Sequence, residues 1–439
     1  MLQTLFKLKE NKTNLKTEIV AGITTFMTLS YIIFVQPTVL SSCGMDFGAV
    51  LVATCVAGAI ATILMGLYAN YPVALAPGMG QNFFFAYTVV LGMGISWEKA
   101  LGAVFISGVL FLFLSFFGFR EKLIDSIPDS LKRAIAVGIG LFVAMIGFQW
   151  SGIVVASSGT LVSLGSLHDK PVLLSILGLV FTSILVAAKV RGSLLWGIFG
   201  TALAGLPLGV VKYHGILGGI PSLEPTLFKL DIAGAFDLGL VSVIFVFFFL
   251  ALFDSVGTLI GVSDQAGFLV NGKLPRAKQA LAADAFGSVA GSVFGTSTIT
   301  AYVESAAGVA EGGRTGLANM ITGALMLLSL FFYPLARMIG EGVQMPGGLQ
   351  IYPVVAPVLI VVGSMMLRNV SRIPWGDTSE AIPAFLTMTV MPFAFSITEG
   401  IAFGFISYSL LKTVTGKARE VHGLVYLFAA LFVVRYIFL

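Results

Sequence analysis

Three polar side chains lie within long apolar stretches of this sequence, and they are the residues best suited to chemistry. Asp254 and Glu304 are carboxylates, and Asn82 is a carboxamide. An ionisable group at the middle of a bilayer costs at least about 2.5–3.5 kcal/mol, so such a residue is a functional candidate by default. In the structural alternative, Asp254 caps or pairs within a helix bundle and Asn82 joins helices. No Lys or Arg lies in the apolar stretch of either carboxylate, which disfavours a buried ion pair.

These groups are suited to binding a planar heterocycle. A ring with adjacent N–H and C=O edges needs carboxylate acceptors, an amide that donates and accepts, and free backbone N–H groups. Neighbouring residues complete the candidate substrate site: Gly80, Gln81, Phe83, Phe253 and Thr300. Phe83 and Phe253 can stack on a ring, although core or lipid-facing packing explains most of the 37 Phe.

The same carboxylates can handle a proton. A carboxyl group in a dry cavity loses hydration of its charged form and so takes up a proton more readily. Protonation of Glu304 can then couple proton entry to substrate movement, and we expect the variant Glu304→Gln to lose proton-driven accumulation. The proposed coupling residues are Asp254 and Glu304.

Composition identifies the elements that must hold these residues. The chain has 439 residues, of which 57% are hydrophobic and 10% charged, and its mean hydropathy is +0.99. Soluble domains carry about 25% charged residues, so this composition indicates an integral membrane protein. A spanning helix needs roughly 20 residues, which leaves room for about a dozen to fourteen spans.

Metal and cofactor sites are not indicated. Cys43 and Cys55 both lie in apolar stretches, and the three His are scattered, so neither a disulfide framework nor a metal-ligand spacing is present. We expect no metal, no cofactor and no nucleic-acid partner.

The apolar segments fall into two groups of seven separated by the polar connection 212–236. Their bounds are 18–42, 47–69, 73–92, 99–119, 135–157, 171–188 and 192–211, then 238–262, 280–295, 297–311, 315–335, 351–368, 380–397 and 400–412. An odd-numbered unit that is duplicated must repeat in inverted orientation. A further stretch, 421–438, is either an extra span or a surface helix. Most Lys and Arg fall in segments that this topology places inside, as the positive-inside rule predicts.

The third segment of each half is interrupted. Residues 73–92 and 292–311 are rich in small and hydroxyl residues, and Pro77-Gly78 cannot continue a regular helix. Paired interrupted segments in corresponding positions point to the central site of a transporter. If residues 78–82 and 300–304 begin half-helices, their free amides supply donors to a ligand.

Other function classes fit less well. Gly78-Met79-Gly80 lacks the βαβ context of a dinucleotide site, and no segment resembles an ATPase domain. An enzyme would need an acid/base or nucleophile cluster, and a channel would be expected to show a repeated polar stripe.

Five long motifs carry a resemblance to a known family. They are EIVAGITTFMTLSYIIFVQP at 18–37, ALAPGMGQNFFFAYTVV at 74–90, LFDSVGTLIGV at 252–262, TAYVESAAGVAEGGRTGL at 300–317 and AIPAFLTMTVMPFAFSITEGIAFGFISY at 381–408. The sequence resembles the AzgA-like branch of the nucleobase–cation symporters, which are permeases for adenine, guanine and hypoxanthine.

The resemblance implies an all-α polytopic membrane fold of about fourteen spans, with core and gate domains and with short strands and half-helices in spans 3 and 10. The implied parts are a cytoplasmic N-terminal segment 1–17, a core domain 18–119 and 238–335, a gate domain 120–211 and 336–412, a connection 212–237, and a C-terminal apolar segment 413–439. Family substrate residues carry over onto Asn82 and Glu304, and Asp254 matches an aspartate tied to the transport movement.

The resemblance also implies a partner set: a nucleobase, a coupling proton, the bilayer of the cell inner membrane, and a second copy of the chain in a homodimer. The sequence departs from the family at Ala251, where a polar or acidic residue is usual, and at Gln81 and Phe83. A xanthine- or uracil-type carrier and an anion carrier of the same architecture therefore stay open as alternatives.

Overall fold

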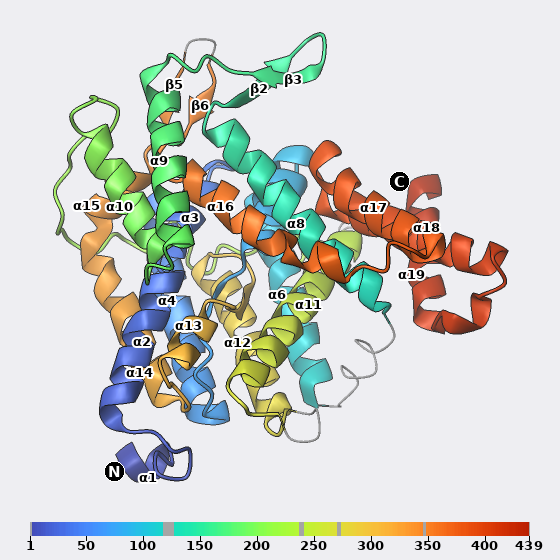
Figure 1. The fold of residues 1–439 in the computed structure, drawn as a ribbon, viewed down its shortest axis with the longest axis horizontal. Coiled ribbons are helices and arrows are strands. Elements are labelled where there is room, and N and C mark those ends of the chain that lie inside the picture. Colours follow the sequence, from blue (N-terminus) through green and yellow to red (C-terminus); the bar gives the residue numbers. More distant parts are fainter. Residues whose placement is uncertain (1, 117–126, 237–240, 270–273, 346–347, 439) are drawn as a thin grey trace. The chain divides into compact units, whose positions relative to one another are not determined.

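The computed structural model is mostly helical, and it describes residues 2–116, 127–236, 241–269, 274–345 and 348–438 (Figure 1). Seven helices in these ranges are long and apolar enough to cross a membrane: Leu15–Ser41, Phe47–Ala69, Trp97–Ser115, Asp129–Trp150, Lys170–Ala187, Val241–Gln265 and Leu317–Gly340. Shorter apolar helices cover Ser193–Gly205 and Gly423–Ile437. The predicted all-α membrane fold is thereby confirmed.

The first half of the chain contains one interrupted segment between long helices. Its elements are α1 (Leu2–Leu5), α2 (Leu15–Leu29), α3 (Ile32–Ser41), α4 (Phe47–Leu64), the π-helix η1 (Met65–Ala69), β1 (Leu75–Pro77), α5 (Met79–Phe83), the π-helix η2 (Phe84–Gly92), α6 (Trp97–Phe116), α8 (Asp129–Trp150), β2 (Val154–Ser157), β3 (Leu161–Leu164), α9 (Lys170–Ala187) and α10 (Ser193–Gly205).

The second half repeats this plan with a second interrupted segment. Its elements are η3 (Gly234–Phe236), α11 (Val241–Gln265), α12 (Ala277–Phe294), β4 (Ile299–Ala301), α13 (Ser305–Ala310), α14 (Leu317–Leu328), η5 (Ser329–Phe332), α15 (Tyr333–Gly340), β5 (Val343–Gln344), β6 (Gln350–Ile351), α16 (Ala356–Met366), η6 (Leu367–Arg372), α17 (Thr378–Phe393), α18 (Ile397–Val414), η7 (Ala418–Glu420) and α19 (Gly423–Phe438).

One predicted apolar segment ends earlier than expected. The apolar segment 135–157 is expected to form one span, but α8 stops at Trp150 and Val154–Ser157 forms a hairpin with Leu161–Leu164. The residues after Trp150 are β-branched and small, which suits a strand. An apolar run alone therefore overestimates the length of this helix.

The chain divides into two compact units. Unit 1 comprises Met1–Phe116 and Gln149–Val358, and unit 2 comprises Phe117–Phe148 and Leu359–Leu439. Unit 1 holds α9 and α10 together with the helices expected in the core domain. The division into core and gate domains stays a prediction.

Close helix packing in unit 1 depends on glycines at crossing points. A Cβ atom on Gly316 would lie 1.9 Å from the backbone oxygen of Gly66, and one on Gly308 would lie 2.1 Å from Oγ1 of Thr25. Real side chains do not tolerate such distances, so these helices can approach only because the residues are glycine.

The turn after α13 holds several elements of unit 1 together. The Glu18 carboxylate, which has no exposed surface, accepts hydrogen bonds from the backbone N–H groups of Arg314 (2.9 Å) and Ala318 (3.3 Å) at the start of α14. The Arg314 guanidinium donates to the carbonyl oxygens of Val309 and Gly313, both at 2.8 Å. Phe6 and Leu8 of the N-terminal segment are buried against Leu317.

In unit 2, α18 packs against both α17 and α19 (Figure 1). Tyr426, near the start of α19, is hydrogen-bonded to Thr413 at 2.8 Å, and Arg435, near its end, forms a 2.9 Å ion pair with Glu399 of α18. Since Thr413 and Glu399 lie at opposite ends of α18, α19 runs antiparallel along that helix. The apolar stretch 421–438 thus packs as a helix beside a predicted span.

Candidate functional site

Two short strands join the interrupted segments at the centre of unit 1. β1 and β4 pair antiparallel, with Leu75 opposite Ala301, Ala76 opposite Thr300 and Pro77 opposite Ile299. Flanking bonds from Gly78 N to Thr298 O (2.9 Å) and from Tyr302 N to Ala74 O (3.0 Å) extend the ladder. Extended backbone is tolerated at membrane depth only where such partners exist. The predicted strands and half-helices of spans 3 and 10 are confirmed.

Side chains of neighbouring helices satisfy the outer edges of these strands. Thr62 of α4 donates to Leu75 O (2.8 Å) and accepts from Leu75 N (2.9 Å), and Ser288 of α12 donates to Ile299 O (2.7 Å). The phenol of Tyr302 donates to Pro77 O. Buried backbone groups must be paired, so these hydroxyls fix where α5 and α13 begin.

Asp254 of α11 meets both interrupted segments. Its Oδ2 atom accepts a hydrogen bond from Nε2 of Gln81 at 3.3 Å and one from Oγ1 of Thr300 at 3.1 Å. Gln81 lies in the first turn of α5, and Thr300 is the middle residue of β4. Three of the residues singled out in the sequence are therefore in direct contact.

Glu304 lies just before α13, and its partner is an aromatic residue. The Oε1 atom accepts a hydrogen bond of 2.7 Å from the phenol of Tyr31, and the backbone oxygen accepts one of 3.2 Å from Thr28. Within the described ranges neither Glu304 nor Asp254 forms an ion pair with Lys, Arg or His.

Asn82 is buried and held by a chain of polar side chains. Its Nδ2 donates to Oε1 of Gln36 at 2.7 Å, and Nε2 of Gln36 donates to Oγ1 of Thr296 and Oγ of Ser297, both at 2.9 Å. Gln36, in α3, has no exposed surface. Gln36 and Tyr31 were missed in the sequence because a single amide or phenol in an apolar stretch is compatible with ordinary helix packing.

The remaining predicted site residues have varied surroundings. Gly80 is buried in the first turn of α5, and Phe83 is buried in an aromatic cluster with Tyr87 (6.1 Å between ring centres) and Trp150 (6.2 Å). Phe253 is half-buried and its ring contacts Phe249 at 5.5 Å. Phe253 differs from Phe83 in two respects. It directly precedes Asp254 in the sequence, and it is partly exposed.

One side of the carboxylate cluster is open. Asp254 is exposed on unit 1 although its partners Gln81 and Thr300 are buried. On the same face of α11, Cβ atoms built on Gly257 and Gly261 would meet no heavy atom within 4 Å. Val303, next to Glu304, is 61% exposed. A ligand can therefore reach these groups from this side of α11.

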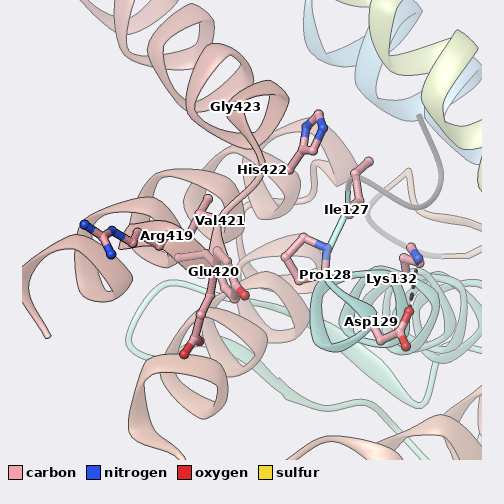
Figure 2. A pocket seen from close by; sticks show the side chains of 10 residues that line it. Ile127, Pro128, Asp129, Lys132, Arg419, Glu420, Val421, His422 and Gly423 are labelled. Atoms are coloured by element: carbon pink, nitrogen blue, oxygen red, sulfur yellow. Dashed lines mark hydrogen bonds and ion pairs between the residues drawn. The ribbon is translucent and has the colours of Figure 1, made fainter. Parts of the chain in front are cut away.

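Two cavities are lined by other residues. The larger, of about 740 Å³, is in unit 2, where Asp129, Lys132, Glu420 and His422 are among its lining residues (Figure 2). The smaller, of about 400 Å³, is an apolar groove between α9 and α10 lined by Phe181, Trp196 and Leu203 among others. No predicted site residue lines either cavity.

A mostly helical membrane fold with two interrupted segments meeting at a polar centre defines a membrane transport protein. The chain belongs to the Permease family, whose family pattern matches residues 16–403. It is 47% identical over 440 residues to the adenine permease AdeP of Escherichia coli, covering 100% of this chain and 96% of that protein. It is 45% identical over 450 residues to the guanine/hypoxanthine permease PbuG of Bacillus subtilis, covering 100% of both.

These relatives confirm the resemblance to purine permeases. Among solved structures, the transmembrane domain of the cyanobacterial bicarbonate transporter BicA has a similar fold, with a TM-score of 0.66 at 14% identity, covering 89% of this chain and 97% of that one. The murine anion transporter Slc26a9 also reaches a TM-score of 0.66, at 11% identity, covering 92% of this chain and 69% of that one. At these identities the likeness concerns the fold alone.

Proposed function

We propose that this permease is a secondary active transporter that imports a purine nucleobase across the cell inner membrane by proton symport. Its relatives in Escherichia coli and Bacillus subtilis are adenine and guanine/hypoxanthine permeases, which supports a purine as the cargo. The observation that carries the proposal is the cluster of Asp254, Glu304, Gln81, Asn82 and Thr300 at the paired strands.

The chemistry of the cluster supports a neutral heterocycle as its ligand. Carboxylate and carboxamide oxygens accept hydrogen bonds from ring and exocyclic N–H groups. Phe253 supplies an aromatic surface beside Asp254. Two carboxylates without a basic partner repel an anion unless they are protonated.

Proton coupling is assigned to Glu304 and the transport movement to Asp254. Glu304 is hydrogen-bonded by Tyr31 and has no basic counter-ion within the described chain, so it can gain a proton without breaking an ion pair. In this proposal the core domain, with spans 1–4 and 8–11, moves against the gate domain, with spans 5–7 and 12–14, and gives alternating access to the site.

Uptake measurements test the proposal. Cells that lack their own nucleobase permeases should accumulate radiolabelled adenine, guanine or hypoxanthine when they express this chain, and a protonophore should abolish accumulation. The Glu304→Gln variant should lose accumulation against a gradient. Uptake by that variant equal to wild type would refute the coupling role, and absence of uptake of any purine would refute the cargo.

An anion carrier of the same architecture is the second candidate, since Asp254 and Glu304 no longer repel an anion once they are protonated. Uptake of radiolabelled bicarbonate and sulfate in the same cells separates the two functions, with xanthine and uracil as further nucleobase arms. The homodimer that the family resemblance implies is tested by light scattering on the purified protein in detergent.

A further inference from the structure

Two adjacent carboxamides in the first turn of α5 are each held through their nitrogen atom. Nε2 of Gln81 donates to Asp254, and Nδ2 of Asn82 donates to Gln36. The carbonyl oxygens, Oε1 of Gln81 and Oδ1 of Asn82, are buried and have no hydrogen-bond partner among the residues that the structure describes. An unpaired buried acceptor destabilises a protein, so such a pair points to a ligand that supplies the missing donors.

Gln36 sets which end of Asn82 is left free. Its own carbonyl oxygen accepts from Asn82 at 2.7 Å, while its nitrogen donates to Thr296 and Ser297 at 2.9 Å each. Thr296 and Ser297 lie between α12 and β4. In this arrangement the carbonyl oxygen of Gln36, and not its nitrogen, faces Nδ2 of Asn82. Gln36 therefore holds the Asn82 amide with Nδ2 toward Gln36, which leaves Oδ1 without a partner in the described chain.

Three side-chain donors close to the carboxylates already have acceptors. Thr300 donates to Asp254, the phenol of Tyr31 donates to Glu304, and the phenol of Tyr302 donates to Pro77 O. These contacts leave the carboxamide oxygens of Gln81 and Asn82 as acceptors without a donor among the described residues. A ligand that fits them must bring several N–H groups of its own.

We propose that Gln36 is a positioning residue that makes Asn82 offer its carbonyl oxygen, and that the site consequently selects bases bearing an exocyclic amino group over the same ring without it. This inference rests on the proposed function, in which the ligand is a purine. The amino group supplies two N–H donors, which match the two free carboxamide oxygens of Gln81 and Asn82.

Binding of matched base pairs to the purified full-length protein tests the inference. Adenine and unsubstituted purine differ by one amino group, as do guanine and hypoxanthine. Ligand-induced thermal stabilisation over a concentration series gives each dissociation constant. In wild type, the amino base of at least one pair should bind about tenfold tighter, since the other base leaves a buried acceptor unpaired.

The preference for the amino base is the ratio of the two dissociation constants of a pair. The variant Gln36→Leu should lower that ratio to about one, because the Asn82 amide can then rotate and present its N–H groups. The variant Gln36→Glu should keep the wild-type ratio, because its oxygen atoms can accept from Asn82 and from both hydroxyls. If Gln36→Leu does not fold, the double variant Thr296→Val/Ser297→Ala removes the anchors of Gln36 and should lower the ratio in the same way. The control Thr62→Val loses a bond to strand β1 and should weaken all bases equally, leaving the ratio unchanged.

The outcomes separate this inference from the proposed function. A wild-type protein that binds purines without preference for the amino base, or a Gln36→Leu variant with an unchanged ratio, overturns the inference alone. If Gln36→Glu also loses the preference for the amino base, as Gln36→Leu should, the positioning role of Gln36 is overturned. A wild-type protein that binds none of the four bases overturns the proposed function and this inference together.

Discussion

The phenol of Tyr31 donates a hydrogen bond of 2.7 Å to Oε1 of Glu304, a residue 273 positions away in the sequence. Tyr31 directly precedes α3, and Glu304 directly precedes α13. The two helices therefore begin beside each other, and the first half of the chain orients a carboxylate that belongs to the second. This contact is the basis of the first prediction.

Tyr31→Phe removes the one side-chain hydrogen bond that Glu304 accepts in the described structure. A hydrogen bond to a charged group contributes about 1.5–3 kcal/mol, so we expect the KM for base uptake to rise by about tenfold or more. Tyr302→Phe is the control, because that phenol bonds a backbone oxygen, and it should lower thermal stability more than it raises the KM. An unchanged KM in Tyr31→Phe would show that the phenol does not orient the binding carboxylate.

Asp254→Asn retains an oxygen that can accept from Gln81 and Thr300 but removes the charge. If Asp254 acts in the transport movement, substrate affinity should stay within about threefold while the maximal uptake rate falls at least about tenfold. Equilibrium binding to the purified protein and uptake in cells measure the two quantities separately. A variant with lost affinity and a normal maximal rate would assign Asp254 to binding instead.

Gly78→Ala should displace the Gln81 side chain. A Cβ atom at position 78 would lie 2.0 Å from Oε1 of Gln81 and 2.8 Å from Oγ1 of Thr300, so the bonds of both residues to Asp254 must change. We expect base affinity to fall by about tenfold, as for the loss of one buried hydrogen bond. Gly219→Ala is the control, because a Cβ there meets no heavy atom within 4 Å. Equal affinities for the two variants would contradict the tight contact.

Lys412→Met should destabilise unit 2. Lys412 Nζ, with a side chain only 3% exposed, forms ion pairs with Glu380 (2.6 Å) and Glu420 (2.9 Å). Removing Lys412 leaves the Glu380 carboxylate, which is 16% exposed, without a counter-ion in the described chain, and this costs up to about 3 kcal/mol. The thermal unfolding midpoint measures the loss, and the double variant Glu380→Gln/Lys412→Met should recover most of it.

A surface pair provides the matched control for Lys412. Lys417 and Asp377 form an ion pair of 2.7 Å whose side chains are 39% and 34% exposed. Exposed pairs contribute about 1 kcal/mol or less, so Lys417→Met should change the midpoint much less than Lys412→Met. Equal shifts for the two variants would mean that burial does not set the strength of the Lys412 network.

Much of the site was predictable because it lies where the chain departs from a regular helix. Pro77-Gly78 and the hydroxyl-rich stretch before Glu304 mark the starts of α5 and α13 within a few residues. Asp254 was identifiable as a lone carboxylate in an apolar run. Gln36 and Tyr31 carried no comparable signal, since a single amide or phenol in a span is compatible with ordinary packing.

Membrane character, the approximate number of apolar segments and the two interruptions follow from the sequence by itself, because they depend on local composition and on the thickness of the hydrocarbon layer. Only the tertiary structure decided which polar groups meet. A hydrogen bond needs its atoms about 3 Å apart, and the pairing of β1 with β4 and the packing of α3 and α11 set these distances. The contacts of Gln81 with Asp254, Gln36 with Asn82 and Tyr31 with Glu304 join residues more than 40 positions apart in sequence, and no local pattern encodes them.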